Sequence, residues 1–258
     1  MNSPRSLFCV LLVGLSLFVR PLEAQLLYTA GHGDLGISYT PGSTAFGMHW
    51  GVDAGATVGG TTLQSQQDYQ PSELIAWTTA TTNTPGSSSS WLGVAGGTSV
   101  FRLGSESFPP NLGFNTSGAG IDSNWVDSTM FITLSSWSGP GNVAIRSGST
   151  SGSSTIFSTF APGVTLDNNT WAMDMGVGHI HLVWYFSQPG TYDLTFDWAS
   201  TYIGGAFASN PLNVTGTGTY QFQAGAIPEP QTWALMLLGF LCLIAMKARC
   251  REVASDEG

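Results

Sequence analysis

The chain has 258 residues, of which 42% are hydrophobic and only 9% are charged, and its formal net charge is −9. Only seven residues are Lys or Arg, which is too few for a basic surface that could neutralise phosphates. The composition therefore argues against a nucleic-acid partner. The three cysteines lie near the two ends, so residues 25–226 have neither a disulfide framework nor a thiolate nucleophile.

The first 24 residues are typical of a secretory signal peptide. Arg5 precedes an apolar stretch that runs from Leu7 to Val19, and the small residue Ala24 suits a cleavage site. Residues 1–24 are therefore predicted to be removed on export, and residues 25–226 are predicted to be the exported domain. This domain retains two basic residues against eleven acidic ones.

Residues 25–226 are predicted to form an all-β domain, as an antiparallel β-sandwich or jelly roll. Gly, Ser and Thr are abundant, and short β-branched and aromatic runs alternate with clusters of turn residues, without helical periodicity. In chain order, strands are expected at 46–52, 74–80, 99–103, 129–136, 142–146, 155–160 and 219–223.

Residues 179–198 are predicted to form a β-hairpin. The run 179–186 is apolar enough for a strand, and Pro189 and Gly190 favour a turn after it. Residues 191–198 alternate strictly between polar and apolar, which is typical of a half-buried strand. The side chains expected to point inward are those of Tyr192, Leu194, Phe196 and Trp198.

The histidines are the sharpest candidates for chemistry. His179 and His181 are two residues apart on a predicted strand, so both rings leave the same face and could share a metal ion at about 2.0–2.1 Å. His32 and Asp34 repeat this spacing, if their segment is extended. A site of His179, His181 and His32, with His49 or Asp34, would suit Zn²⁺, with Mn²⁺, Cu²⁺ or Ni²⁺ as alternatives.

Two other interpretations of these histidines stay open. The pair at 179 and 181 would also suit the polar outer face of a strand, and His32 would also suit a turn. The nearest further carboxylates in the sequence are Asp53 and Asp174.

Catalysis is not predicted, because the chain lacks a nucleophile elbow, a phosphate-binding loop and a His-Glu-x-x-His helix. A metal-dependent hydrolase stays an alternative if the histidines leave a coordination position open. A further alternative is exopolysaccharide binding through exposed Trp91 and Trp137, although most tryptophans are expected in the core.

The C-terminus carries a second segment typical of protein targeting, besides the signal peptide. Pro228, Glu229 and Pro230 precede the uncharged span 231–246, which would form a helix of about 24 Å, and a basic cluster follows at Lys247, Arg249 and Arg251. Residues 227–251 resemble a PEP-CTERM sorting signal. The resemblance implies transient membrane anchoring, cleavage by an exosortase and release to the surface or matrix. The acidic tail 252–258 departs from it, and a plain single-pass anchor is the alternative.

Residues 178–196, which begin Gly-His-Ile-His and end with Pro-Gly-Thr-Tyr-Asp-Leu-Thr-Phe, resemble the motif of the choice-of-anchor M family of actinobacterial-type surface-anchored domains. The segment 31–35 resembles the opening of that family. Some members accompany metal-type transport systems. The resemblance therefore implies a surface protein associated with metal, and it implies no established enzymatic activity. The chain is therefore predicted to be a non-enzymatic exported protein.

Overall fold

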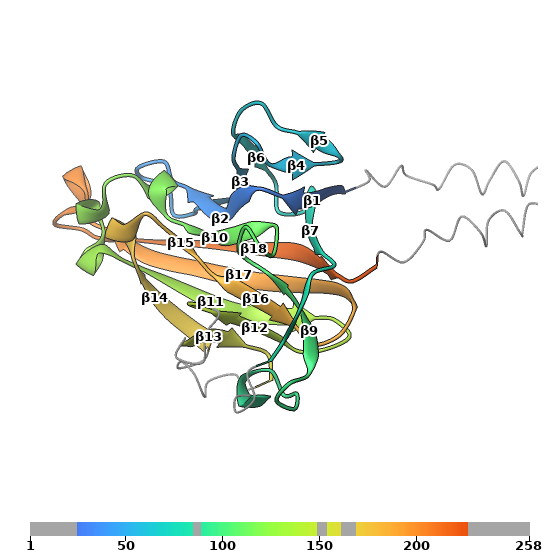
Figure 1. Cartoon of the computed structure of the whole chain (residues 1–258). Coiled ribbons are helices and arrows are strands. Elements are labelled where there is room, and N and C mark those ends of the chain that lie inside the picture. Colours follow the sequence, from blue (N-terminus) through green and yellow to red (C-terminus); the bar gives the residue numbers. More distant parts are fainter. Residues whose placement is uncertain (1–24, 85–88, 149–153, 161–168, 227–258) are drawn as a thin grey trace, which may run out of the picture. The chain divides into compact units, whose positions relative to one another are not determined.

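The computed structural model describes residues 25–84, 89–148, 154–160 and 169–226 (Figure 1). The chain divides into two units, 1–225 and 226–258, and the fold below is that of the first. The predicted signal peptide, the sorting signal and the span 231–246 lie outside the described residues. Within the described ranges, no helix is long and apolar enough to cross a membrane.

The described residues form three β-sheets, which confirms the all-β class. Sheet A has eight strands in the order β14 (Thr170–Asp174), β11 (Thr129–Ser138), β17 (Gly190–Tyr202), β18 (Leu212–Ala224), β7 (Leu74–Thr78), β1 (Leu26–Ala30), β4 (Thr57–Val58) and β5 (Thr61–Thr62). Sheet B has the order β15 (His179–His181), β10 (Asn111–Asn115), β2 (His32–Ser38), β3 (Gly47–Val52) and β6 (Gln67–Tyr69). Sheet C has the order β13 (Thr155–Ser158), β12 (Val143–Arg146), β16 (Val183–Phe186), β9 (Ser99–Leu103) and β8 (Thr81–Asn83).

The helices of the described part are single 3-10 turns. They are η1 (Ser89–Trp91), η2 (Ser117–Ala119), η3 (Asp122–Asn124), η4 (Val126–Ser128), η6 (Met175–Val177) and η7 (Gly205–Phe207). The expectation of purely antiparallel sheets is wrong, because β1 with β7, β2 with β10, and β7 with β18 pair in parallel. Two parallel neighbouring strands must be joined by a long crossover connection. The alternation of polar and apolar residues within a strand carries no information about such connections.

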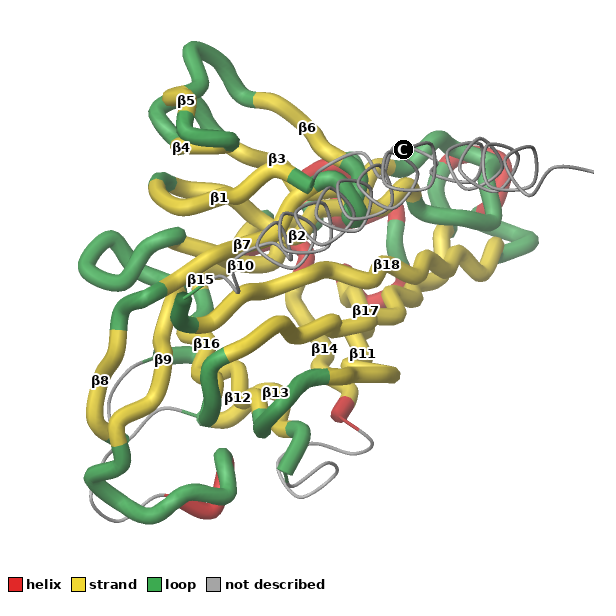
Figure 2. Tube along the Cα trace, turned by 90° about the vertical axis from the view of Figure 1, so that its right-hand side faces the viewer, coloured by secondary structure: helices red, strands yellow, loops and turns green. Residues whose placement is uncertain are grey.

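One aromatic core joins the three sheets into a sandwich-like fold. Sheet A meets sheet B where the rings of Trp50 and Tyr220 lie 4.9 Å apart, and it meets sheet C where Trp184 stacks on Phe222 at 4.9 Å. The longest pair in sheet A is β17 with β18, which run side by side in Figure 2. The predicted inward residues of β17 are all buried, which confirms the alternation: Tyr192, Leu194, Phe196 and Trp198.

The predicted hairpin is wrong. The run 179–186 splits at Leu182 into β15, which belongs to sheet B, and β16, which pairs with β9 and β12 of sheet C. The turn after β16 then carries the chain across to β17 in sheet A. All four residues of β16 are buried, because one face meets the core and the other lies under the loop that holds Trp91. A strand buried on both faces cannot be the half-exposed partner that a simple hairpin needs.

Each of the seven other predicted ranges overlaps an observed strand: β3, β7, β9, β11, β12, β13 or β18. The largest difference is in β18, which begins at Leu212 rather than at 219. Gly216 and Gly218 interrupt the apolar pattern there and weaken the strand signal of the sequence. Pairing with β17 stabilises the extended backbone at both glycines.

The expectation that Trp91 is exposed is wrong, since only 5% of this residue is accessible, whereas Trp137 is 40% exposed. Trp91 packs against Tyr185 with ring centroids 5.0 Å apart, and the Arg146 guanidinium lies 4.6 Å from the Trp91 ring centroid. Trp91 therefore covers the outer face of sheet C.

Replacing Trp91 with alanine is expected to lower the free energy of unfolding by about 3 kcal/mol, because a large buried ring is lost. Trp137→Ala is the matched control and should change stability by less than about 1 kcal/mol. Chemical denaturation of both variants measures the difference. Equal effects would contradict the burial of Trp91.

Candidate metal centre

The outer face of sheet B carries an unusual set of polar residues. Along β2, Leu35 and Ile37 point into the core, so the alternate residues His32 and Asp34 must lie on the opposite face. The Tyr28 hydroxyl donates a hydrogen bond to the carbonyl of Gly31 at 2.9 Å, and this bond holds the backbone between β1 and β2. The segment that holds His32 and Asp34 is therefore extended, as the spacing argument required.

The strand register brings β15 to the same place. Gly113 of β10 is paired with Asp34 on one side and with His181 on the other. Since Gly113 has no side chain, the side chains from the two flanking strands can lean toward each other over it. Asn111 and Asn115 stand on either side of Gly113 along β10. We call this group of side chains around Gly113 the bowl; it lies where strands β2, β10 and β15 run next to one another (Figure 1).

The three histidines of this bowl could hold a metal ion. One ligand nitrogen from each of His32, His179 and His181 lies within 4.8 Å of the others. The Nε2 atoms of His32 and His181 are 3.2 Å apart. Two ligands of a tetrahedral ion at about 2.0–2.1 Å lie about 3.4 Å from each other, so this pair already has the separation of two ligands on one ion.

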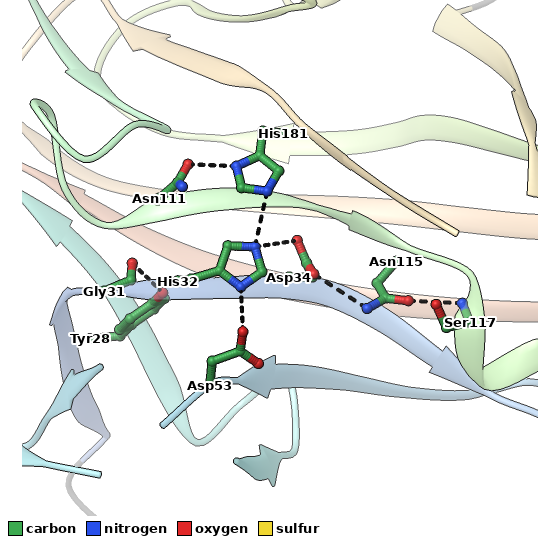
Figure 3. Close-up of polar contacts among 9 residues, drawn as sticks. All are labelled: Tyr28, Gly31, His32, Asp34, Asp53, Asn111, Asn115, Ser117 and His181. Atoms are coloured by element: carbon green, nitrogen blue, oxygen red, sulfur yellow. Dashed lines mark hydrogen bonds and ion pairs between the residues drawn. The ribbon is translucent and has the colours of Figure 1, made fainter. Parts of the chain in front are cut away.

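The partners of the other ring nitrogens fix both tautomers (Figure 3). His32 Nδ1 lies 2.7 Å from a carboxylate oxygen of Asp53, which can only accept, so this nitrogen carries the proton. His181 Nδ1 donates in the same way to Asn111 Oδ1 at 3.0 Å. In the neutral rings, both Nε2 atoms then face each other with lone pairs, and only a proton or a cation between them makes the contact favourable. Such outer partners are the usual means of orienting metal-binding histidines.

Asp34 lies at the base of the bowl and is 3% exposed. Its Oδ2 accepts from the Asn115 side-chain amide at 3.3 Å, while Oδ1 is buried and has no hydrogen-bond partner among the described residues. Oδ1 is 3.8 Å from His32 Nε2. A buried carboxylate oxygen without a donor is costly, and a cation at the histidines would compensate it.

Burial also shifts the pKa values of two groups in the bowl. Desolvation raises the pKa of Asp34, although the nearby histidines and the Asn115 hydrogen bond act in the other direction. Desolvation lowers the pKa of His181, and repulsion from His32 lowers it further. Lowering the pKa of an imidazole favours its neutral form, which is the form that binds a metal.

Gly113→Ala is expected to damage both the fold and the bowl. A Cβ atom at this position would lie 2.0 Å from the carbonyl oxygen of Ile180 and 2.8 Å from Asp34 Oδ1. The first is a backbone atom of the paired strand, so β15 would have to move away. We expect a loss of about 1–3 kcal/mol of stability, measured by denaturation, together with weaker zinc binding.

Gly51→Ala is the matched control, because Gly51 of β3 is paired with Asp34 on its other side. A Cβ atom on Gly51 would meet no atom closer than 3.8 Å. This variant should keep its stability and its zinc binding. If Gly113→Ala behaved like Gly51→Ala, the tight packing of β15 over Gly113 would be disproved.

Of the five candidate ligands, the structure brings together His32, His179 and His181, and it places Asp34 beside them, with Oδ1 3.8 Å from His32 Nε2. His49 is not part of this group, since its ring packs against Gly36 and its Nε2 lies 4.0 Å from Asp68 Oδ1. The reason is the register, because His49 is paired with Gly36, which is two residues along β2 from Asp34. Asp174 instead accepts a hydrogen bond from its own turn, at Gly176.

Sequence reasoning missed Asn111, Asn115 and Gly113. They lie far from the histidines in the chain, and Asn and Gly occur throughout the sequence, so no local signal marks them. A scan of protein-family models and searches of curated proteins and of solved structures each found no significant match to this chain.

Proposed function

We propose that this chain is a non-enzymatic exported surface protein whose β domain binds one transition-metal ion, preferably zinc, through His32, His179, His181 and Asp34. The observation that carries the metal proposal is the pair of Nε2 atoms 3.2 Å apart, whose rings are both held by acceptors at Nδ1. The buried Asp34 Oδ1 without a donor supports it independently. Three imidazoles and one carboxylate are a donor set that suits zinc.

Metal content tests this proposal directly. Purified protein, incubated with zinc and then freed of loosely held ions, should retain about one equivalent by elemental analysis. Manganese, copper and nickel belong in the same experiment, because imidazole ligands suit several of these ions. Retention of none of the four metals would disprove the proposal.

The export part of the proposal is supported by the two ends of the sequence. Residues 1–24 have the form of a signal peptide, and residues 227–251 resemble a PEP-CTERM signal. The partners would then be the secretion machinery, the membrane for a time, and an exosortase. Mass spectrometry of the protein from the cell surface should show loss of residues 1–24 and cleavage near Pro228. A full C-terminus in the membrane fraction would favour the plain anchor instead.

Binding of exopolysaccharide is the second candidate function, and Trp137 is the residue that favours it. This residue of β11 is 40% exposed, so a sugar ring could stack on its indole, whereas Trp91 is buried. Loss of matrix retention in Trp137→Ala would support this candidate, and unchanged retention would count against it. A metal-dependent hydrolase, the remaining alternative, would need an activated water at an open position on the ion.

A further inference from the structure

We propose that the ion in the bowl keeps a coordination position on its solvent side, and that this position takes the carboxylate of an external ligand. The inference rests on the proposed metal site, and it concerns what that site binds. A free organic acid and an acidic polysaccharide would present the same group.

The depth of the ligands determines which side of the ion stays open. The Asp34 side chain is only 5% exposed, that of His32 is 27% exposed, and His179 and His181 are exposed. Their donors therefore approach the ion from the sheet and from the rim of the bowl. β15 is also an edge strand, so no further strand of sheet B covers the bowl on that side. An ion with these four protein donors is closed toward Gly113, and a fifth donor can reach it only from the solvent side.

The charges favour an anionic ligand. A divalent ion held by three neutral imidazoles and one carboxylate keeps one positive charge. The two basic residues of the domain lie in sheet C, where Arg102 stacks on Phe108 and Arg146 on Trp91. Asp53 lies 2.7 Å from His32, so the loaded bowl as a whole is close to neutral and the positive charge is concentrated at the ion itself. Because Asp53 and Asp68 are close neighbours on this face, a singly charged carboxylate is favoured over a more highly charged anion.

The rim also offers a donor for the second oxygen of such a carboxylate. Asn111 uses Oδ1 to accept from His181, and its Nδ2 has no acceptor among the described residues. Asn115, in contrast, has both ends occupied, since its amide donates to Asp34 and its oxygen accepts from the backbone of Ser117. Asn111 Nδ2 is therefore the group available to a ligand. A neutral hydroxyl carries no charge to match that of the ion, and it has no second oxygen to accept from Asn111 Nδ2.

Cobalt provides the test, because its visible absorption reports the coordination of the ion. The purified full chain is loaded with one equivalent of Co²⁺ and titrated with galacturonate, with galactose as the neutral control. We expect a saturable change in the cobalt spectrum with galacturonate and none with galactose. Polygalacturonate distinguishes the sources of the carboxylate: binding at least about tenfold tighter per uronate than the monomer indicates a polymer, and equal binding indicates a small acid.

The failures of the two proposals can be told apart. A cobalt spectrum that forms but does not respond to galacturonate would overturn the open position. A spectrum that responds equally to galactose would overturn its preference for a carboxylate. Both results would leave the metal site intact. If no protein-bound cobalt spectrum forms and zinc is not retained either, the metal site itself fails. The Asn111→Asp variant keeps an oxygen acceptor for His181 Nδ1 and loses the Nδ2 donor. At saturating Co²⁺, it should bind galacturonate several-fold more weakly than the wild-type protein. An unchanged galacturonate affinity in Asn111→Asp would remove Asn111 Nδ2 from the ligand site.

Discussion

Replacing both His179 and His181 with alanine is expected to reduce the zinc content of the purified protein from about one equivalent to less than about a tenth. The double change removes two of the three imidazoles and leaves His32 and Asp34, which are too few donors for a stable site. Both histidines are exposed on an edge strand, so the metal-free fold should lose less than about 0.5 kcal/mol. Elemental analysis and thermal unfolding of the same samples measure the two effects.

His49→Ala is the matched control for this experiment. His49 lies on the same face of sheet B but faces Asp68 rather than the bowl. The His49→Ala variant should therefore retain one equivalent of zinc. Full zinc content in the double variant, or equal loss in His49→Ala, would show that the ion binds elsewhere.

Asp34→Asn is expected to have opposite effects on the metal-free and the zinc-loaded protein. Without metal, the buried carboxylate has an oxygen that lacks a donor, so the neutral amide should stabilise the fold by on the order of 1 kcal/mol. With metal, the same change removes an anionic oxygen beside the ion, and the zinc affinity should fall roughly 10–100-fold. Denaturation with and without zinc, combined with a zinc titration, measures both.

The stabilisation by Asp34→Asn should also depend on pH. Burial raises the pKa of Asp34 above its usual value, so the folded wild-type protein holds this proton more tightly than the unfolded chain does. Wild-type stability therefore falls as pH rises through the window from the usual pKa to the raised one, and the penalty is complete above it. The advantage of the variant should be largest at neutral pH and should disappear at low pH, where the wild-type carboxyl is protonated in both states. A metal-free variant less stable than wild type at neutral pH would contradict this.

The parts of the fold that depend on local alternation were predictable from the sequence. In β17 every second residue is apolar, and these residues are buried as expected. The pairing of the strands was not predictable in the same way. The turn at Pro189 and Gly190 has the composition of a hairpin turn, yet it connects two sheets, because β16 is buried on both faces. Composition identifies a turn but does not say whether the next strand pairs with the last one.

The candidate site was predictable to the same degree. The spacings of His179 with His181 and of His32 with Asp34 place each pair on one face of a strand, and this is confirmed. The two pairs meet because β10 lies between their strands and has Gly113 at the position paired with both Asp34 and His181. Neither this register nor the outer partner Asn111 is encoded near the histidines. His49 was included on residue type alone, and the register excludes it.

Anomalous diffraction from crystals of the zinc-loaded protein, recorded at the zinc absorption edge, tests the metal site most directly. We expect one strong peak in the bowl above Gly113, about 2.0–2.1 Å from the Nε2 atoms of His32 and His181. His179 and Asp34 should complete the protein ligands. A peak beside His49 and Asp68, or zinc-loaded crystals with no peak at the histidines, would contradict the assignment of this bowl as the metal centre.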